Sequence, residues 1–138
     1  MTDATRAQLA RDLERDEGRE SFPYTDTVNK LTIGVGHNLT DRGLPGPVID
    51  LLLELDIDIA VKDCERFEWW ARLSPNRQRA MANMSFNLGR DRLRGFRRLL
   101  AALDRDDYRT AAKEMRDSQW AKQTGARAER LAVLMERG

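Results

Sequence analysis

A run of 27 residues, 47–73, begins with a proline and then contains no glycine and no further proline. Proline is favoured in the first turn of a helix, because the N–H group that it lacks would have no partner there. Residues 55–59 (LDIDI) alternate as a strand does, so the apolar pattern alone leaves helix and strand open. The unbroken length favours a helix, which would extend about 40 Å at about 1.5 Å per residue. We therefore predict one long helix over 47–73.

The N-terminal residues are expected to form a helix that ends at Glu17. Thr2 or Asp3 suits the N-cap position, and Gly18 takes the left-handed conformation that commonly follows a helix. Two leucines one turn apart are predicted to form the inner face of this helix: Leu9 and Leu13.

A small sheet and a loop are expected next. Two or three short strands are predicted between 22 and 37, where β-branched residues and glycines gather. The turn at 26–30 needs a residue that tolerates a positive φ, and Asn29 can serve. Residues 38–47 contain two glycines and two prolines, which is typical of a loop.

The remaining residues carry the signals of several helices. Ser74 suits an N-cap, and Pro75 suits the first turn of a helix that ends at Gly89. Further helical segments are expected at 90–94, around Phe96 to Leu103, after Asp106 or Asp107, and after Gly125. Their apolar residues are predicted to form the core: Met81, Met84, Phe86, Leu88, Leu99, Leu103, Ala111, Ala112, Met115, Ala128, Leu131 and Leu134. The predicted fold class is α+β, mainly α.

Length and composition fit one domain. The chain has 138 residues, of which 41% are hydrophobic and 34% are charged. No apolar run approaches the roughly 18 residues of a membrane span, and the polar N-terminus does not resemble a signal peptide. We therefore expect no stable membrane insertion. Cys64 is the only cysteine, so no internal disulfide is possible, and it is predicted to be a small core or helix-face residue.

Charge is unevenly distributed along the chain. Residues 1–73 hold nine Lys or Arg against fifteen Asp or Glu, a net charge of −6, whereas residues 74–138 hold fifteen against eight, a net charge of +7. Such asymmetry can steer an anionic polymer, or it can reflect solvated helix faces. Nucleic acid is not expected as a partner, because no DNA- or RNA-binding motif has the required spacing. One histidine and one cysteine cannot build a usual zinc site, so neither metal nor cofactor is expected.

Two carboxylates and a threonine lie within residues 17–37: Glu17, Asp26 and Thr32. Glycoside hydrolysis usually needs one carboxyl group that donates a proton and a second one that is ionised. A threonine hydroxyl can hold a water molecule by donating and accepting at once. Each residue also has an ordinary structural explanation, as a helix-end acid, a turn-starting aspartate and a strand threonine.

These residues carry a resemblance to a known family. Asp16-Glu17-Gly18, Tyr24-x-Asp26 and the run TIGVGH at 32–37 resemble the active-site signature of the phage-type lysozymes, glycoside hydrolase family 24. Further matches in the same order lie at 83–89 (NMSFNLG), 95–96 (GF) and 118–127 (SxWxxQxxxR). The resemblance covers about residues 9–138.

The resemblance implies a two-lobed, lysozyme-like fold within one domain, 1–138. A small β-hairpin lobe, about 18–55, and a larger helical lobe, about 1–17 and 56–138, would be joined by the long helix. The implied activity is that of an endolysin, which hydrolyses the β-1,4 bonds between N-acetylmuramic acid and N-acetylglucosamine in bacterial peptidoglycan and lyses the cell.

The resemblance also implies roles for individual residues. Glu17 would be the general acid, while Asp26 and Thr32 would direct a water molecule in an inverting reaction. The implied substrate-binding residues are Phe86, Asn87, Gln123, Thr124 and Arg127, whose polar groups suit sugar hydroxyl, acetamido and peptide carboxylate groups.

The histidine and the tryptophans are interpreted as structural residues. His37 is expected to bond to an acidic residue of the long helix, with Asp56 as the candidate. Trp120 is predicted to pack in the core. Trp69 and Trp70 are adjacent and cannot both face one core from a helix, so one of them should be partly exposed.

The implied protein is a phage or prophage enzyme and a monomer. Without a signal peptide it would accumulate in the host cytoplasm, and a holin-type partner would release it to the periplasm and cell wall. Two alternatives remain open. A lytic transglycosylase would leave anhydro-sugar ends, and a non-catalytic module would bind the wall or nucleic acid without cutting it.

Overall fold

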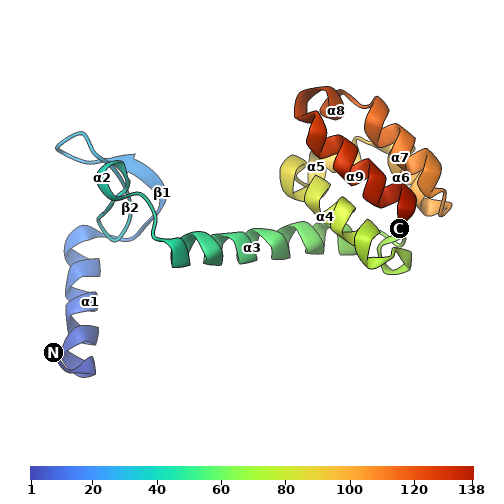
Figure 1. Cartoon of the computed structure of the whole chain (residues 1–138). Coiled ribbons are helices and arrows are strands. Elements are labelled where there is room, and N and C mark those ends of the chain that lie inside the picture. The colour runs from blue at the N-terminus through green and yellow to red at the C-terminus, as the bar shows by residue number, and fades with distance from the viewer. The chain divides into compact units, whose positions relative to one another are not determined.

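The computed structural model describes all 138 residues and divides them into two compact units, Met1–Asp50 and Leu51–Gly138. Figure 1 labels their elements. The chain is mainly helical with one small antiparallel sheet, as predicted for an α+β protein. None of its helices has both the length and the apolar composition that a membrane span requires.

The first unit contains a helix, a three-stranded sheet and a second, short helix. Their bounds are α1 (Asp3–Glu17), β1 (Glu20–Thr25), β2 (Leu31–Gly34), β3 (His37–Asn38) and α2 (Leu39–Arg42). The strands are antiparallel in the order β1-β2-β3, and Thr32 in the central strand pairs with Tyr24 on one side and Asn38 on the other. The prediction of two or three strands is confirmed.

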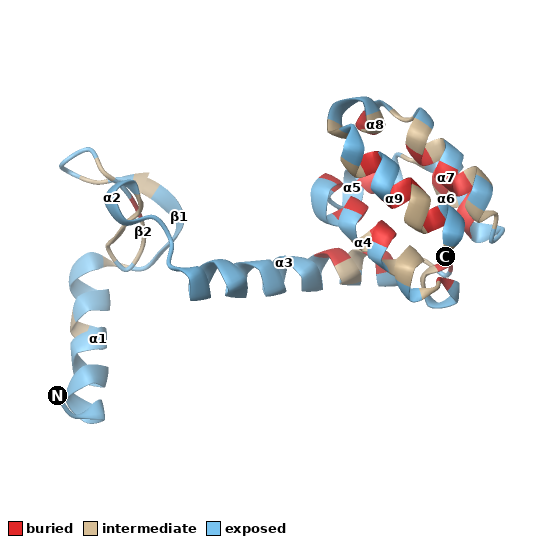
Figure 2. Cartoon of the chain, viewed as in Figure 1, coloured by how far each residue is buried: buried red, intermediate tan, exposed pale blue.

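Helix α1 has the predicted ends, but its predicted inner face is not covered within this unit. The hydroxyl of Thr2 accepts from the N–H of Thr5, and Gly18 follows with a φ of 79°. Within this unit, however, Leu9 and Leu13 stay 41% and 45% exposed, so no residue of the unit covers the expected inner face. The reason is that this unit has almost no interior: Thr32 is its only buried residue, and Figure 2 shows α1 almost entirely in the colour of exposed residues.

The segment predicted as a loop, 38–47, contains a turn of helix. Asn38 ends β3 and caps α2 by accepting from the N–H of Asp41. Gly43 then ends α2 with a φ of 58°. The glycines and prolines of this segment therefore bracket a short helix rather than exclude one.

Helix α3 (Gly46–Glu65) begins where the sequence predicts, with Pro47 in its first turn, but it ends eight residues early. The cause is packing beyond Glu65. Trp69 is completely buried and stacks on Phe67, with 4.9 Å between ring centroids, and a 3₁₀ turn follows at Trp70–Arg72. Tight turns, unlike a continued helix, bring both aromatic rings to the core.

Six helices complete the second unit: α4 (Pro75–Leu88), α5 (Arg90–Arg94), α6 (Arg97–Asp104), α7 (Tyr108–Asp117), α8 (Gln119–Thr124) and α9 (Ala126–Arg137). Helix α9 packs against α7, α4 and α8, and α6 packs against α7 (Figure 1). The predicted caps at Ser74 and Asp107 are confirmed, because each side chain accepts from the N–H three residues on. The sequence did not predict α8.

The hydrophobic core lies in the second unit (Figure 2). Its largest fully buried side chains include Trp69, Met81, Met84, Leu93 and Met115. Cys64 is buried and free, as predicted, and burial raises the pKa of its thiol to about 11. The predicted core residue Phe86 is instead 43% exposed.

Replacing Met84 with alanine is expected to lower the free energy of unfolding by about 2–5 kcal/mol, because the methionine is completely buried and its removal leaves a cavity. Urea unfolding followed by circular dichroism measures the change. The matched surface variant is Arg130→Ala on α9, where the side chain is exposed and the expected change is within about 0.5 kcal/mol. Equal effects of the two substitutions would contradict this account of the core.

Candidate active site

All three predicted catalytic residues lie in the first unit. Glu17 is the last residue of α1, and its carboxylate lies beside the backbone of Gly36, between β2 and β3. Glu17 makes no hydrogen bond or ion pair with another side chain, unlike its neighbour Asp16, which pairs with Arg15 at 2.9 Å. The Glu17 carboxylate is therefore free to bind a ligand without breaking a side-chain contact of the fold.

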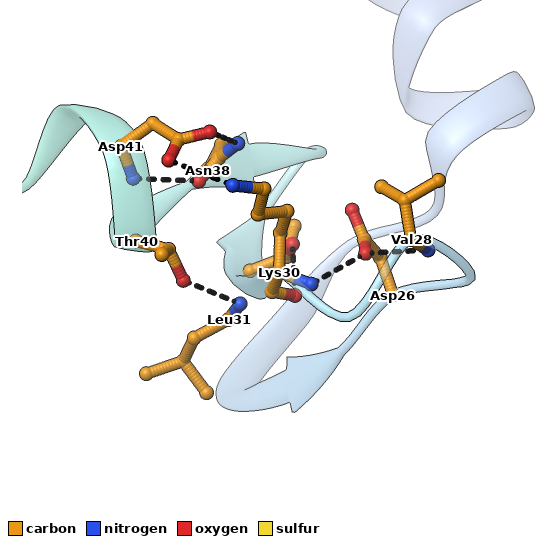
Figure 3. A network of polar contacts seen from close by, with 8 residues as sticks. Asp26, Val28, Lys30, Leu31, Asn38, Thr40 and Asp41 are labelled. Atoms are coloured by element: carbon orange, nitrogen blue, oxygen red, sulfur yellow. Dashed lines mark hydrogen bonds and ion pairs between the residues drawn. The ribbon is translucent and has the colours of Figure 1, made fainter.

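Asp26 holds the turn between β1 and β2 with one of its two carboxylate oxygens. Oδ1 accepts from the N–H of Val28 at 3.0 Å and from the N–H of Lys30 at 2.8 Å (Figure 3). Asn29 takes the positive φ of 61° that this turn was predicted to need. The second oxygen, Oδ2, has no donor within the protein, so Asp26 can act both in the turn and toward a ligand.

The peptide of Lys30 links Asp26 to Thr32. Its N–H donates to Asp26 Oδ1, and its carbonyl accepts from the N–H of Asp26 at 2.9 Å and from the hydroxyl of Thr32 at 3.1 Å. Thr32 is 4% exposed, and its hydroxyl proton is already directed at the carbonyl. The lone pairs of Oγ1 are thus the part of this side chain that remains to receive a hydrogen bond.

A network of polar contacts joins the β1–β2 hairpin to α2 (Figure 3). The ammonium of Lys30 pairs with Asp41 at 3.0 Å, and the amide of Asn38 donates to the other oxygen of Asp41 at 2.9 Å. The hydroxyl of Thr40 accepts from the N–H of Leu31 at 2.8 Å. These contacts add side-chain links between the hairpin and α2 to the backbone pairing of the sheet.

Asp41 makes the stability of this unit sensitive to acid. The hydrogen bond from Lys30, followed by that from Asn38, lowers the pKa of its carboxyl below the ordinary value. A lowered pKa contributes stability that is present above about pH 4 and is lost as the pH falls through the folded-state value.

We therefore expect wild type to be more resistant to urea than Asp41→Asn at pH 7, and expect this difference to disappear near pH 2. The amide NMR signal of Leu31, whose N–H bonds to α2, reports the unfolding of this unit. A difference between the two proteins that does not change with pH would contradict the role assigned to Asp41.

His37 has a structural contact within the first unit. Its Nε2 lies 2.6 Å from the carbonyl oxygen of Gly43, and its backbone pairs with Ile33 in the sheet. The ring thereby connects β3 to the residue that ends α2. Asp56 belongs to the second unit, so the predicted bond between it and His37 stays a prediction.

The predicted substrate-binding residues all lie in the second unit, in two groups. Phe86 and Arg127 line one pocket on α3, α4 and α9, together with Leu53, Ile57, Ala60, Arg79, Ala82 and Asn83. Arg127 is held there by Asn83, whose side-chain oxygen accepts from its Nε at 2.9 Å and whose carbonyl accepts from its Nη2 at 3.2 Å. Asn83 was not singled out from the sequence, although it begins the quoted NMSFNLG motif.

The second group of predicted substrate-binding residues includes Asn87 and Thr124, and Trp120 bonds to both of them. Its indole N–H donates to Asn87 Oδ1 at 2.8 Å, and its carbonyl accepts from the hydroxyl of Thr124 at 2.9 Å. The burial of Trp120 at 3% exposure confirms its predicted packing role. Asn87 keeps an amide N–H₂ free to donate, and Gln123 is exposed without a side-chain partner. As predicted for the adjacent tryptophans, Trp69 is buried and Trp70 is partly exposed.

Comparisons with known proteins identify the family of this chain. The phage lysozyme family matches residues 14–137. Probable T4-type lysozymes 2 and 1 of Dictyostelium discoideum are each 28% identical, and each alignment covers 91% of this chain and 92% of the relative. The pre-baseplate central spike protein Gp5 of Enterobacteria phage T4 is also 28% identical over 94% of this chain, which corresponds to only 28% of that protein. The chain therefore belongs to the phage lysozyme family and is a glycoside hydrolase.

Proposed function

We propose that this enzyme is an endolysin that hydrolyses the β-1,4 bonds between N-acetylmuramic acid and N-acetylglucosamine in bacterial peptidoglycan. Glu17 is the general acid, Asp26 is the general base, and Thr32 positions the attacking water. The observation that carries the proposal is the Lys30 peptide, which bonds to both Asp26 and Thr32 and leaves Asp26 Oδ2 without a protein partner.

The proposed reaction uses each group for one task. The carboxyl of Glu17 donates its proton to the glycosidic oxygen that leaves. Water donates one hydrogen bond to Asp26 Oδ2 and another to Thr32 Oγ1, whose own proton points to the carbonyl of Lys30. Asp26 takes a proton from that water while the water oxygen bonds to the anomeric carbon, with inversion of configuration.

We assign substrate contacts to Phe86, Asn87, Gln123, Thr124 and Arg127. The bond from Trp120 leaves Asn87 as a donor, which suits an acetamido carbonyl or a sugar hydroxyl. Arg127, oriented by Asn83, suits a carboxylate of the stem peptide. We also propose one lysozyme domain, 1–138, with a small lobe at about 18–55 and a helical lobe formed by about 1–17 and 56–138.

The proposed biological role is lysis of a bacterial host by a phage or prophage. The enzyme acts as a monomer, accumulates in the host cytoplasm and reaches the periplasm and cell wall through a holin-type partner. Membership of the phage lysozyme family supports this role. The positive charge of residues 74–138 supports attraction to an anionic wall polymer.

Typing of the product ends tests the reaction. Purified peptidoglycan is digested with the wild-type enzyme, and the new ends are identified by mass spectrometry. Hydrolysis gives reducing N-acetylmuramic acid ends that incorporate one oxygen from ¹⁸O-labelled water. Anhydro ends without that label would instead identify a lytic transglycosylase, and a folded protein that releases no fragments would favour a non-catalytic binding module.

A further inference from the structure

The carboxylate of Glu17 lies in space that a side chain at position 36 would occupy. A Cβ atom built on Gly36 would be 2.9 Å from Glu17 Oε2, 3.1 Å from its Cδ and 3.2 Å from its Cγ. A carbon atom does not approach a carboxylate oxygen so closely in folded proteins. Residue 36 must therefore lack a side chain for Glu17 to keep this position.

The turn alone does not explain the glycine at this place. Gly34 and Gly36 flank Val35 between β2 and β3, with φ values of 67° and 63°. Both positions disfavour residues with a side chain to a similar degree. A Cβ atom on Gly34, however, would have no neighbour within 4 Å. The two glycines thus share the backbone requirement and differ in the contact with Glu17.

The contact involves the mobile end of a side chain rather than a rigid part of the backbone. A methyl group at position 36 would be accommodated most cheaply by rotating the Glu17 side chain, which has no hydrogen-bond partner to retain it. The fold would then survive while the carboxyl group moves. Displacement by a fraction of an ångström matters for a proton donor, which must meet the leaving oxygen at hydrogen-bond distance.

We propose that Gly36 is a positioning residue for Glu17. Because Gly36 has no side chain, the Glu17 carboxyl group can keep its position relative to the glycosidic bond that is cleaved. This inference rests on the proposed role of Glu17 as the general acid. It assigns Gly36 no contact with substrate. Its effect passes through the Glu17 carboxyl group.

The test compares Gly36→Ala with Gly34→Ala, which introduces the same methyl group at nearly the same φ. Both variants are expected to lose similar thermal stability. Gly36→Ala should also lower kcat by about 10–100-fold on soluble, uncross-linked peptidoglycan strands, with KM within about threefold of wild type. Gly34→Ala should keep the wild-type kcat when assayed below its melting temperature.

Two further measurements separate positioning from a merely structural effect. The ¹³C resonance of the Glu17 carboxyl carbon, assigned by its loss in Glu17→Gln, should shift in Gly36→Ala and not in Gly34→Ala. Glu17→Asp, whose shorter side chain withdraws from position 36, should cost less activity in the Gly36→Ala background than in wild type, so that the two substitutions are non-additive.

The outcomes distinguish this proposal from the one on which it rests. If Glu17→Gln is inactive but both glycine variants behave alike in kcat and carboxyl resonance, Gly36 has no positioning role and the acid assignment stands. Additive effects of Gly36→Ala and Glu17→Asp would overturn the positioning role in the same way. If Glu17→Gln keeps the wild-type rate, the acid assignment fails and the proposal for Gly36 fails with it.

Discussion

Replacing Glu17 with glutamine is expected to lower the rate of peptidoglycan hydrolysis by about 10²–10⁴-fold, the usual contribution of general acid catalysis. Glutamine has the same shape but carries no proton acidic enough to give to the leaving oxygen. The fold should be unaffected, because Glu17 makes no side-chain hydrogen bond or ion pair, and the amide fits the same space beside Gly36. The clearing of Gram-negative cells with permeabilised outer membranes measures the rate.

Two neighbouring carboxylates provide the controls for this substitution. Asp16→Asn and Glu20→Gln remove one negative charge each, within three residues of Glu17, and should keep activity within about twofold because both side chains are exposed at the surface. Circular dichroism and thermal unfolding verify that all three variants are folded. Equal clearing by wild type and Glu17→Gln would remove Glu17 from the catalytic mechanism.

The parts of the fold that the sequence predicted correctly depend on local signals. Thr2, Gly18, Ser74 and Asp107 act within one turn of the helix that each begins or ends, so their effect can be read without knowing the tertiary structure. Asn29 likewise takes its positive φ inside a five-residue turn. In each case the residue type and its immediate neighbours contain the physical cause.

The errors concern elements whose ends are determined by distant residues. Nothing between Glu65 and Leu73 breaks a helix locally, and α3 ends because the rings of Phe67 and Trp69 stack in a core built from residues much later in the chain. The leucines of α1 show a related limit, since helical spacing identifies an apolar face but not which residues cover it, and no residue of the first unit covers Leu9.

In the candidate site, too, some residues could be predicted from the sequence and others could not. Glu17, Asp26 and Thr32 could be proposed because their residue types suit glycoside hydrolysis and their spacing resembles that of the phage-type lysozymes. Their partners could not be proposed. The Lys30 peptide contributes through its backbone, which any residue other than proline would supply, so its side chain gives no signal. The approach of Glu17 to Gly36 also required coordinates.

Asp26→Asn is the second substitution with a large expected effect, a loss of about 10²–10⁴-fold in hydrolysis. Asparagine keeps a carbonyl oxygen that can accept from the N–H groups of Val28 and Lys30, so the turn should remain. It cannot take a proton from water. The urea midpoint should therefore match that of wild type while the release of reducing ends falls.

Asp26→Ala separates the two tasks of this residue. Alanine removes the base and also the acceptor of two backbone hydrogen bonds, which should destabilise the hairpin by about 1–3 kcal/mol in addition to the loss of activity. If Asp26→Asn loses activity and Asp26→Ala loses both activity and stability, the carboxylate is catalytic as well as structural. If Asp26→Asn keeps the wild-type rate and the products carry anhydro ends, no base is needed, because a lytic transglycosylase can work with one essential acid. That result would replace hydrolysis by transglycosylation while leaving Glu17 as the acid.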